Sequence, residues 1–302
     1  MSLAVGAVGG PLHPCSAKRG GGMHWIQPGQ RAPEAERRQG RGISMTGTTP
    51  NVDTIIQGDC LEEMKKLPDG CIDMILCDLP YGTTACKWDH VIPFEPLWKE
   101  YKRLIKDRGA IVLTASQPFT SALVMSNIKQ AKHFWIWLKE RGTGFQVAKY
   151  RPMMATEDII AFCAGDGTFA TYNPQMNPLR KRTKEKNAST RSDSSPILHM
   201  CNGNRLATER HPTNVIPISR DQCKMHPTQK PVALFEYLIK TYTNEGDLVL
   251  DNCIGSGTTA VAAKRTGRHF IGIELSEEYC EIARKRVAAV PARLDRWAEA
   301  GG

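Results

Sequence analysis

The sequence predicts an α/β fold: a mostly parallel, twisted sheet flanked by helices. From about residue 51 onward, apolar strand-like segments alternate with segments of helical periodicity. Near the end of the chain, a strand runs directly into a Gly255-Ser256-Gly257 loop and then into a helix. Parallel strands need long crossover connections, usually helices, so this alternation favours a parallel sheet. With 302 residues, 41% of them hydrophobic, the chain can bury a substantial core.

Residues 51–165 are predicted to form the first half of this domain. The first strand ends in Gly58-Asp59, and the second ends in an Asp-Leu-Pro-Tyr corner that begins at Asp78. Trp135 and Trp137 alternate along a later strand, so both are expected to pack on one face beneath helices. We expect strands at 52–60, 72–80, 109–116, 133–140 and 157–165, and helices at 61–67, 94–106 and 119–128.

Residues 225–302 are predicted to form the second half. An amphipathic helix over 231–243 precedes a strand, glycine loop and helix over 247–267. A strand over 268–275 and a final helix over 276–290 end the pattern. No internal repeat is visible, and no apolar run approaches the roughly 20 residues that a membrane helix needs.

The segment between the two halves, residues 166–224, breaks this rhythm. It is rich in Asn, Ser, Thr, Arg and Lys and is predicted to be an insertion or small subdomain with mobile loops. From residue 178 to residue 224 it carries ten basic and four acidic residues, a net charge of +6, within a chain of net charge +9. Such a patch favours an anionic partner such as nucleic acid, although a solvated linker is the alternative.

Residues 1–50 are rich in Gly, Pro, Arg and Ala without an apolar period, which predicts a disordered tail. They lack the apolar core of a signal peptide. Met45 stands just before the first strand, so a start codon assigned too early is an alternative origin for residues 1–44. The ten cysteines include no C-x-x-C pair, which indicates a reducing cytoplasm and no structural zinc.

The glycine loop predicts a nucleotide-like ligand. Glycines allow a ligand to approach the backbone, and the following helix N-terminus adds partial positive charge. Glu274 ends the next strand, where a carboxylate can accept both ribose hydroxyls. Gly255-x-Gly257-x-x-Ala260 also fits the dinucleotide fingerprint, so a nicotinamide-dependent oxidoreductase is an alternative, and a structural turn is another.

The order of segments argues against the oxidoreductase. After Glu274 a single helix remains, so the other strands of this sheet must come from earlier in the sequence. Ligands in open α/β sheets bind beyond the carboxyl ends of the strands. The acids that end four strands, Asp59, Asp78, Asp251 and Glu274, are therefore expected to face one crevice.

These residues resemble the β class of amino-group DNA methyltransferases. "DLPY" (Asp78–Tyr81) is similar to the catalytic Asp-Pro-Pro-Tyr motif, "HPTQKP" (His226–Pro231) to the segment before the cofactor strand, and "DNCIGSGTT" (Asp251–Thr259) to the S-adenosylmethionine loop. The three motifs follow the β-class order over roughly residues 52–288, and "DLPYGTTACKWD" is most similar to phage and prophage members. The sequence departs from the family pattern at Leu79, Asn252 and Cys253.

The resemblance implies the S-adenosylmethionine-dependent methyltransferase fold, with the catalytic motif before the cofactor loop. It implies a site-specific enzyme that methylates the N6 of adenine in double-stranded DNA after base flipping. A chemical argument agrees with this role, because an exocyclic amino group needs two acceptors to turn its lone pair toward the methyl group. The side chain of Asp78 and the carbonyl of Leu79 would be these acceptors, and Tyr81 would stack on the base. A local turn at Asp78 is the alternative.

The resemblance also assigns roles to individual residues. Glu274 would bind the ribose and Asp59 the adenine amino group of the cofactor, while Asp251, Thr228 and Lys230 would lie near its methionine end; His226 would be structural. Trp88 would stack near the target or belong to the core. Catalytic residues would be Asp78, Leu79, Pro80 and Tyr81; cofactor-binding residues Asp59, Cys60, Thr228, Lys230, Asp251, Gly255, Ser256, Gly257, Thr258 and Glu274; and DNA-binding residues Lys87, Trp88, Arg180, Lys181, Arg182, Lys184, Arg205 and Arg210.

Three alternatives to adenine methylation stay open at this point. A cytosine-N4 methyltransferase would use the same fold, although Asp at position 78 favours adenine and serine is more usual in the cytosine enzymes. The nicotinamide-dependent oxidoreductase is the second, and a DNA-binding protein crippled by Leu79 is the third. In the predicted organisation, residues 51–165 are the catalytic half, 166–224 the target-recognition insertion and 225–302 the cofactor half; a homodimer is left open.

Overall fold

The computed structural model describes residues 50–82, 90–165, 167–184, 206–221 and 229–291. Residues 47–302 form one compact unit, and a second unit, residues 1–46, lies outside the described residues, as does most of the tail predicted for residues 1–50. The strands are β1 (Thr54–Gln57), β2 (Ile72–Asp78), β3 (Ile105–Ala115), β4 (Ala131–Thr143), β5 (Met154–Cys163), β6 (Asn177–Lys184), β7 (Leu206–Arg210), β8 (Val215–Pro217), β9 (Leu248–Asp251) and β10 (His269–Glu274). The helices are α1 (Cys60–Lys65), α2 (Phe94–Leu104), α3 (Phe119–Ser126), α4 (Val232–Tyr242), α5 (Thr258–Arg265) and α6 (Glu277–Ala288), with a short 3-10 helix at Phe145–Val147.

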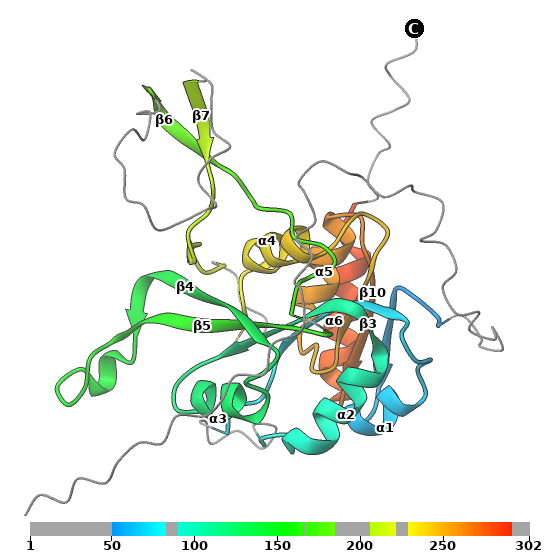
Figure 1. Ribbon diagram of the computed structural model, residues 1–302. Helices are drawn as coiled ribbons and strands as arrows, with labels where there is room; N and C mark the ends of the chain where they lie inside the picture. Colours follow the sequence, from blue (N-terminus) through cyan, green and yellow to red (C-terminus); the bar gives the residue numbers. More distant parts are fainter. Residues whose placement is uncertain (1–49, 83–89, 166, 185–205, 222–228, 292–302) are drawn as a thin grey trace, which may run out of the picture. The chain divides into compact units, whose positions relative to one another are not determined.

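Eight strands form one sheet in the order β1-β10-β9-β2-β3-β5-β4-β8. Figure 1 shows the long neighbouring strands β4 and β5 of this sheet. All neighbouring pairs are parallel except those that β5 makes with β3 and β4. The prediction of a mostly parallel α/β sheet is therefore confirmed. Antiparallel β5 follows from the direct β4–β5 connection, because a strand that returns without a crossover must run the other way.

Helices cover both faces of the sheet, because alternate side chains of each buried strand point to opposite sides. Along β2, Met74 and Leu76 belong to the core beneath α4, α5 and α6, whereas Ile75 and Cys77 belong to the core beneath α1, α2 and α3. The order along the chain thus places α1–α3 on one face and α4–α6 on the other.

The two alternating tryptophans of β4 pack as expected. Trp135 and Trp137 are both buried, in the core that contains α4. The indole of Trp135 donates to the Tyr242 hydroxyl at the end of α4 (2.7 Å), and that of Trp137 donates to the carbonyl of Ile218 (2.7 Å). The prediction that they pack beneath a helix is confirmed.

The bounds of several elements differ from the sequence prediction, and two of the differences affect the sheet. Helix α2 ends at Leu104 and β3 begins at Ile105, because Ile105 already pairs with Ile72 of β2. The basic segment predicted as a separate insertion is partly integrated into the sheet: β8 pairs with β4, and Ile216 is buried in the core. The β6–β7 ribbon forms a second, two-stranded sheet.

Candidate active site

The predicted site residues follow strands that are neighbours in the sheet. Asp78 ends β2 and Asp251 ends β9, and these parallel strands pair through Met74 with Val249 and Ile75 with Leu250. Glu274 ends β10 on the other side of β9, and Asp59 follows β1, whose Gly58 N–H donates to the Glu274 carbonyl (2.9 Å). Carboxyl ends of neighbouring parallel strands meet at one edge, so the four acids share the edge at which α/β proteins bind ligands.

Asp78 is the centre of a polar network. Its carboxylate accepts hydrogen bonds from Lys230 Nζ at both oxygens, Oδ1 at 2.8 Å and Oδ2 at 2.7 Å. The Tyr81 hydroxyl donates to Oδ1 (2.7 Å), and the Thr114 hydroxyl also donates to Oδ1. Among the described residues, Oδ2 accepts from Lys230 alone, so Oδ2 retains room for another donor.

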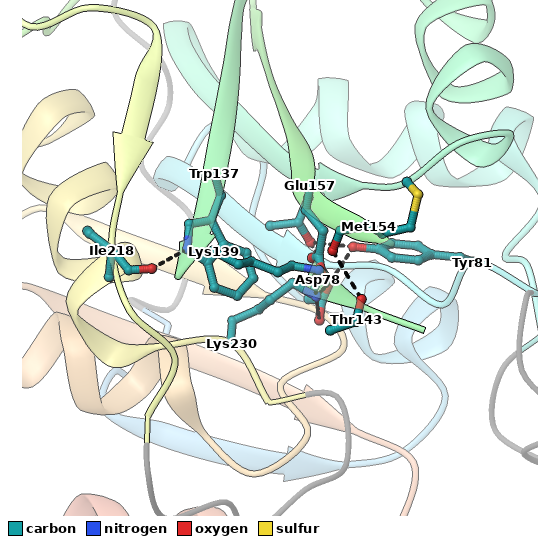
Figure 2. A network of polar contacts seen from close by, with 10 residues as sticks. Asp78, Tyr81, Trp137, Lys139, Thr143, Met154, Glu157, Ile218 and Lys230 are labelled. Atoms are coloured by element: carbon teal, nitrogen blue, oxygen red, sulfur yellow. Dashed lines mark hydrogen bonds and ion pairs between the residues drawn. The ribbon is translucent and has the colours of Figure 1, made fainter. Parts of the chain in front are cut away.

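The network continues across the sheet to two further charges (Figure 2). Lys230 Nζ lies 3.3 Å from Glu157 Oε2, and Lys139 Nζ lies 2.7 Å from Glu157 Oε1. The Lys139 and Lys230 side chains are only 5% and 7% exposed. Two buried cations therefore alternate with two carboxylates, and the formal charges of these four side chains cancel.

The cause of this arrangement is the two-residue period of the strands. Asp78 continues the face of Met74 and Leu76, Lys139 continues the face of Trp135 and Trp137, and Glu157 is paired with Trp137. All of these side chains point to the α4 side of the sheet, and Lys230 lies just before α4. Burial lowers the pKa of Lys230, but attraction by Asp78, Tyr81 and Glu157 outweighs it and holds that pKa well above its usual value.

Leu79 and Tyr81 occupy different environments in the corner. The side chain of Leu79 is 4% exposed and packs into the core beneath α2 and α3. The ring of Tyr81 stacks on Phe119, with centroids 5.2 Å apart and planes at 28°, and Lys230 Nζ lies 5.4 Å from its centroid. Burial, followed by the charge of Asp78, raises the pKa of Tyr81, so its hydroxyl remains a proton donor.

The glycine loop joins β9 to α5. Gly257 has φ +85°, and a Cβ there would lie 2.8 Å from Cβ of Ala283 in α6, so close packing also requires glycine. Gly255 has φ +51° and nothing within 4 Å of such a Cβ. Arg286 of α6 donates to the Ser256 carbonyl (2.6 Å) and hydroxyl (2.8 Å), and these bonds anchor the loop to α6.

The acids beside this loop hold the backbone and leave room for a ligand. Glu274 Oε2 accepts from the Gly255 N–H (2.8 Å), and Oε1 accepts from the Ser276 N–H (2.9 Å). Asp59 caps α1 through Oδ1, with bonds from the N–H groups of Leu61 and Glu62. Each Glu274 oxygen and Asp59 Oδ2 can accept a further bond from a polar ligand. An open glycine backbone next to two such carboxylates fits a nucleoside.

Asp251 is buried, at 3% exposure, and its bonds are internal. It accepts from the Cys253 N–H (3.0 Å) and from the Thr259 hydroxyl. The side-chain oxygen of its neighbour Asn252 accepts a hydrogen bond from the buried Tyr101 hydroxyl (2.5 Å). Asn252 is one of the residues at which the sequence departs from the family pattern. Ser256 and Thr258 are also buried, at 4% and 7% exposure, so the loop presents mainly backbone.

Several predicted residues lie outside the described residues: Thr228, Lys87, Trp88, Arg205 and also His226, which was predicted to be structural. Arg180, Lys181, Arg182 and Lys184 lie on β6, where the backbone alone is described, and Arg210 is exposed at the end of β7. Lys230, predicted near the methionine end of the cofactor, is bonded to Asp78, and the cofactor role of Cys60 at the start of α1 stays a prediction.

Sequence reasoning missed Thr114, Lys139 and Glu157. Thr114 pairs directly with Asp78 across β2 and β3 and is fully buried. The signal for Lys139 was present, because a lysine two residues after Trp137 falls on the buried face of its strand. A buried lysine requires a carboxylate partner, and Glu157 on the neighbouring strand supplies it.

Comparison with known proteins places these residues in context. The DNA methylase family model of the N6/N4 type matches residues 72–285. The chain is 31% identical over 255 residues to the DNA adenine methyltransferase YhdJ of Escherichia coli K12, covering 78% of this chain and 82% of that protein. It is 28% identical over 251 residues to the type II methyltransferase M.HpaI of Haemophilus parainfluenzae, covering 77% and 73%.

Solved structures share the fold. The M1.HpyAVI–SAM complex matches with a TM-score of 0.53 and 25% identity, over 77% of this chain and 98% of the other. The cytosine-N4-specific PvuII DNA methyltransferase matches with a TM-score of 0.56 and 17% identity, over 77% and 85%. No helix in the described part of the chain combines the length and apolar character needed to cross a membrane.

Proposed function

Because the chain belongs to the DNA methylase family of the N6/N4 type, we propose that it transfers a methyl group from S-adenosylmethionine to the exocyclic N6 of adenine in DNA. The observation that carries this proposal is the adjacency of two features: the Asp78 corner after β2 and the glycine loop after β9. A methyl donor and an acceptor base bound there would meet at one edge of the sheet.

The chemistry follows from the position of Asp78. S-adenosylmethionine would supply an electrophilic methyl group on a sulfonium: the sulfur–methyl bond breaks as the nitrogen–methyl bond forms, the thioether leaves, and the amino nitrogen gives up one proton. Asp78 Oδ2 would accept a hydrogen of the adenine amino group, and the Leu79 carbonyl would accept the other, so that the nitrogen lone pair faces the methyl group. Thr114 and Tyr81 hold Oδ1 in place, which keeps the orientation of the carboxylate fixed during the transfer.

The cofactor would lie across the glycine loop. Glu274 would accept the ribose hydroxyls and Asp59 Oδ2 the adenine amino group, while the buried hydroxyls of Ser256 and Thr258 keep the loop in shape. Asp251 accepts hydrogen bonds from the Thr259 hydroxyl and the Cys253 N–H and would thereby stabilise the conformation of the loop.

Adenine is favoured over cytosine as the target. The relative YhdJ is named a DNA adenine methyltransferase at 31% identity. The cytosine-N4-specific PvuII enzyme shares the fold at 17% identity, a level that carries no argument about the target base. Asp78 at the first position of the motif also agrees with adenine, and the site gives no support to the nicotinamide alternative beyond the glycine spacing.

DNA would approach from the carboxyl edge of the sheet. The base must leave the duplex to reach Asp78, at a cost of a few kcal/mol. Strand β4 runs parallel to β3, so the hairpin between β4 and β5 lies beyond this edge. The hairpin carries Phe145 and Tyr150, which are 80% and 88% exposed, together with the exposed cations Arg141, Lys149 and Arg151. Aromatic rings and cations together suit unstacked bases and phosphates.

The other expectations rest on the same proposal. The basic residues of β6 and β7 would bind phosphates or base edges, as the target-recognition role of residues 166–224 requires. A cytoplasmic location and a homodimer stay predictions.

The experiment combines the purified protein, DNA and S-adenosylmethionine with a labelled methyl group, followed by mass spectrometry of the nucleosides. We expect N6-methyladenine, and a product containing N4-methylcytosine alone would contradict the adenine assignment. Asp78→Asn should abolish methylation while calorimetric binding of S-adenosylmethionine persists. Equal methylation by wild type and Asp78→Ala would contradict the catalytic role of Asp78. Binding of NADH in place of S-adenosylmethionine would support the oxidoreductase.

A further inference from the structure

Glu157 has one buried oxygen that no hydrogen bond satisfies. Oε1 is bonded to Lys139, whereas Oε2 is buried without a hydrogen-bond partner among the described residues and has Lys230 Nζ at 3.3 Å. A buried carboxylate oxygen normally accepts a hydrogen bond, so an open one next to a cation needs an explanation. The nearby Lys230 is the group that could use it.

Lys230 contacts the same oxygen of Asp78 that methyl transfer requires. Oδ1 already accepts from Thr114, Tyr81 and Lys230 (2.8 Å), so the target amino group would come to Oδ2, where Lys230 also donates at 2.7 Å. If Lys230 remained there, the amino hydrogen would share Oδ2 with an ammonium, which makes that oxygen a weaker acceptor for the amino group. If Lys230 left without a new acceptor, a buried cation would lose part of its compensation, which is costly.

We propose that Glu157 and Lys139 are positioning residues for methyl transfer, in which Glu157 Oε2 takes over a Lys230 N–H when the target amino group binds Asp78 Oδ2. This inference rests on the proposed function. Lys139 holds Glu157 through Oε1 and leaves Oε2 directed at Lys230. The ammonium therefore stays between two carboxylates throughout this exchange of hydrogen bonds.

The central test is Glu157→Gln, which keeps the shape but removes the charge that attracts Lys230. The amide is a weaker acceptor, so Lys230 stays on Asp78 Oδ2. We expect kcat to fall by about 100-fold, a size typical of a misplaced catalytic group. The KM for DNA and the calorimetric Kd for S-adenosylmethionine should stay within about twofold of wild type, because within the described part of the chain no hydrogen bond or ion pair joins Glu157 or Lys230 to the glycine loop.

A merely structural role is tested by a double variant. Glu157→Gln leaves Lys139 as a buried cation without its carboxylate, which can destabilise the fold. Lys139→Met combined with Glu157→Leu removes both charges, and such replacements are often neutral or stabilising. We expect this double variant to fold with a melting temperature near that of wild type and still to lose kcat. Recovery of wild-type kcat in it would overturn the proposal.

Asp158→Asn is the matched control. Asp158 adjoins Glu157, but its side chain lies on the opposite face of β5 and accepts from Thr120 of α3 (2.7 Å). The control should retain wild-type kcat, and an equal loss in Asp158→Asn and Glu157→Gln would count against a specific role for Glu157. If the wild type methylates DNA and Glu157→Gln matches its kcat, this inference fails alone; if the wild type does not methylate DNA, the proposed function fails.

Discussion

At the residue scale, Asp78 and Asp251 end neighbouring strands but have opposite electrostatic surroundings. Asp78 is compensated by Lys230, whereas the donors to Asp251, which include the Thr259 hydroxyl, the Cys253 N–H and the Cys77 thiol, are neutral. Burial raises the pKa of Asp251 from 3.8 to about 7, although these hydrogen bonds oppose the shift. The two carboxylates therefore have different surroundings and tasks: Asp78 is held by a cation at the corner proposed for methyl transfer, and Asp251 fixes a turn.

The raised pKa of Asp251 predicts a pH dependence of stability. The folded protein holds this proton up to about pH 7, while the unfolded chain releases it near pH 4. The contribution of this protonation to the free energy of unfolding is complete below pH 4 and is lost as the pH rises to 7. The loss is at most roughly 4 kcal/mol. Asp251→Asn should remove this slope, and urea unfolding of both proteins at pH 4.5 to 8 measures it. Identical slopes for wild type and variant would contradict the assignment.

At the element scale, the site is a row of side chains across four adjacent strands. Asp78 on β2, Thr114 on β3, Glu157 on β5 and Lys139 on β4 all project toward the α4 face. A shift of one residue in the pairing of any strand would turn its side chain to the opposite face. The registers that build the core therefore also align the polar network.

The α5 end of the site gives a prediction about packing. Gly257 and Gly246 have nearly the same φ, +85° and +84°, but only at Gly257 would a Cβ meet another atom within 4 Å. Both Ala variants carry similar backbone strain, of order 1 kcal/mol. Gly257→Ala should lose a further 1–3 kcal/mol of stability from overpacking against Ala283 and should bind S-adenosylmethionine more weakly. Chemical denaturation and calorimetry measure the two effects; equal stability of the two variants would contradict the packing argument.

The β4–β5 hairpin gives a prediction about DNA. If Lys149 and Arg151 contact phosphates, replacing both with Gln should reduce the slope of log affinity against log salt by about 2. Fluorescence anisotropy with a duplex oligonucleotide at several salt concentrations measures this slope. The control variant, Lys240→Gln with Arg265→Gln, removes the same charge near the C-terminal ends of α4 and α5, which precede the amino ends of β9 and β10. A similar change in both variants would indicate a non-specific charge effect.

At the scale of the whole molecule, the sequence predicted the parts of the fold that depend on local pattern. Apolar periodicity located most strands and helices, and the order of Asp78 and the Gly255 loop predicted that they share one edge. Contacts between distant residues were not predictable in this way. Lys230 and Asp78 are 152 residues apart, and β8 pairs with β4 through Val215, inside a segment whose composition indicated a loop.

The division of the chain into two units gives the last prediction. Residues 47–302 form a compact unit of their own, and this unit includes every residue to which a catalytic, cofactor or DNA role is assigned. A protein that begins at Met45 should therefore keep its methylation rate, its affinity for S-adenosylmethionine and its melting temperature. Residues 1–44 carry several arginines, so an effect on DNA binding would appear as a lower KM for DNA in the full chain that fades with added salt. A large loss of kcat on truncation, at saturating DNA, would instead show that the first unit takes part in the reaction.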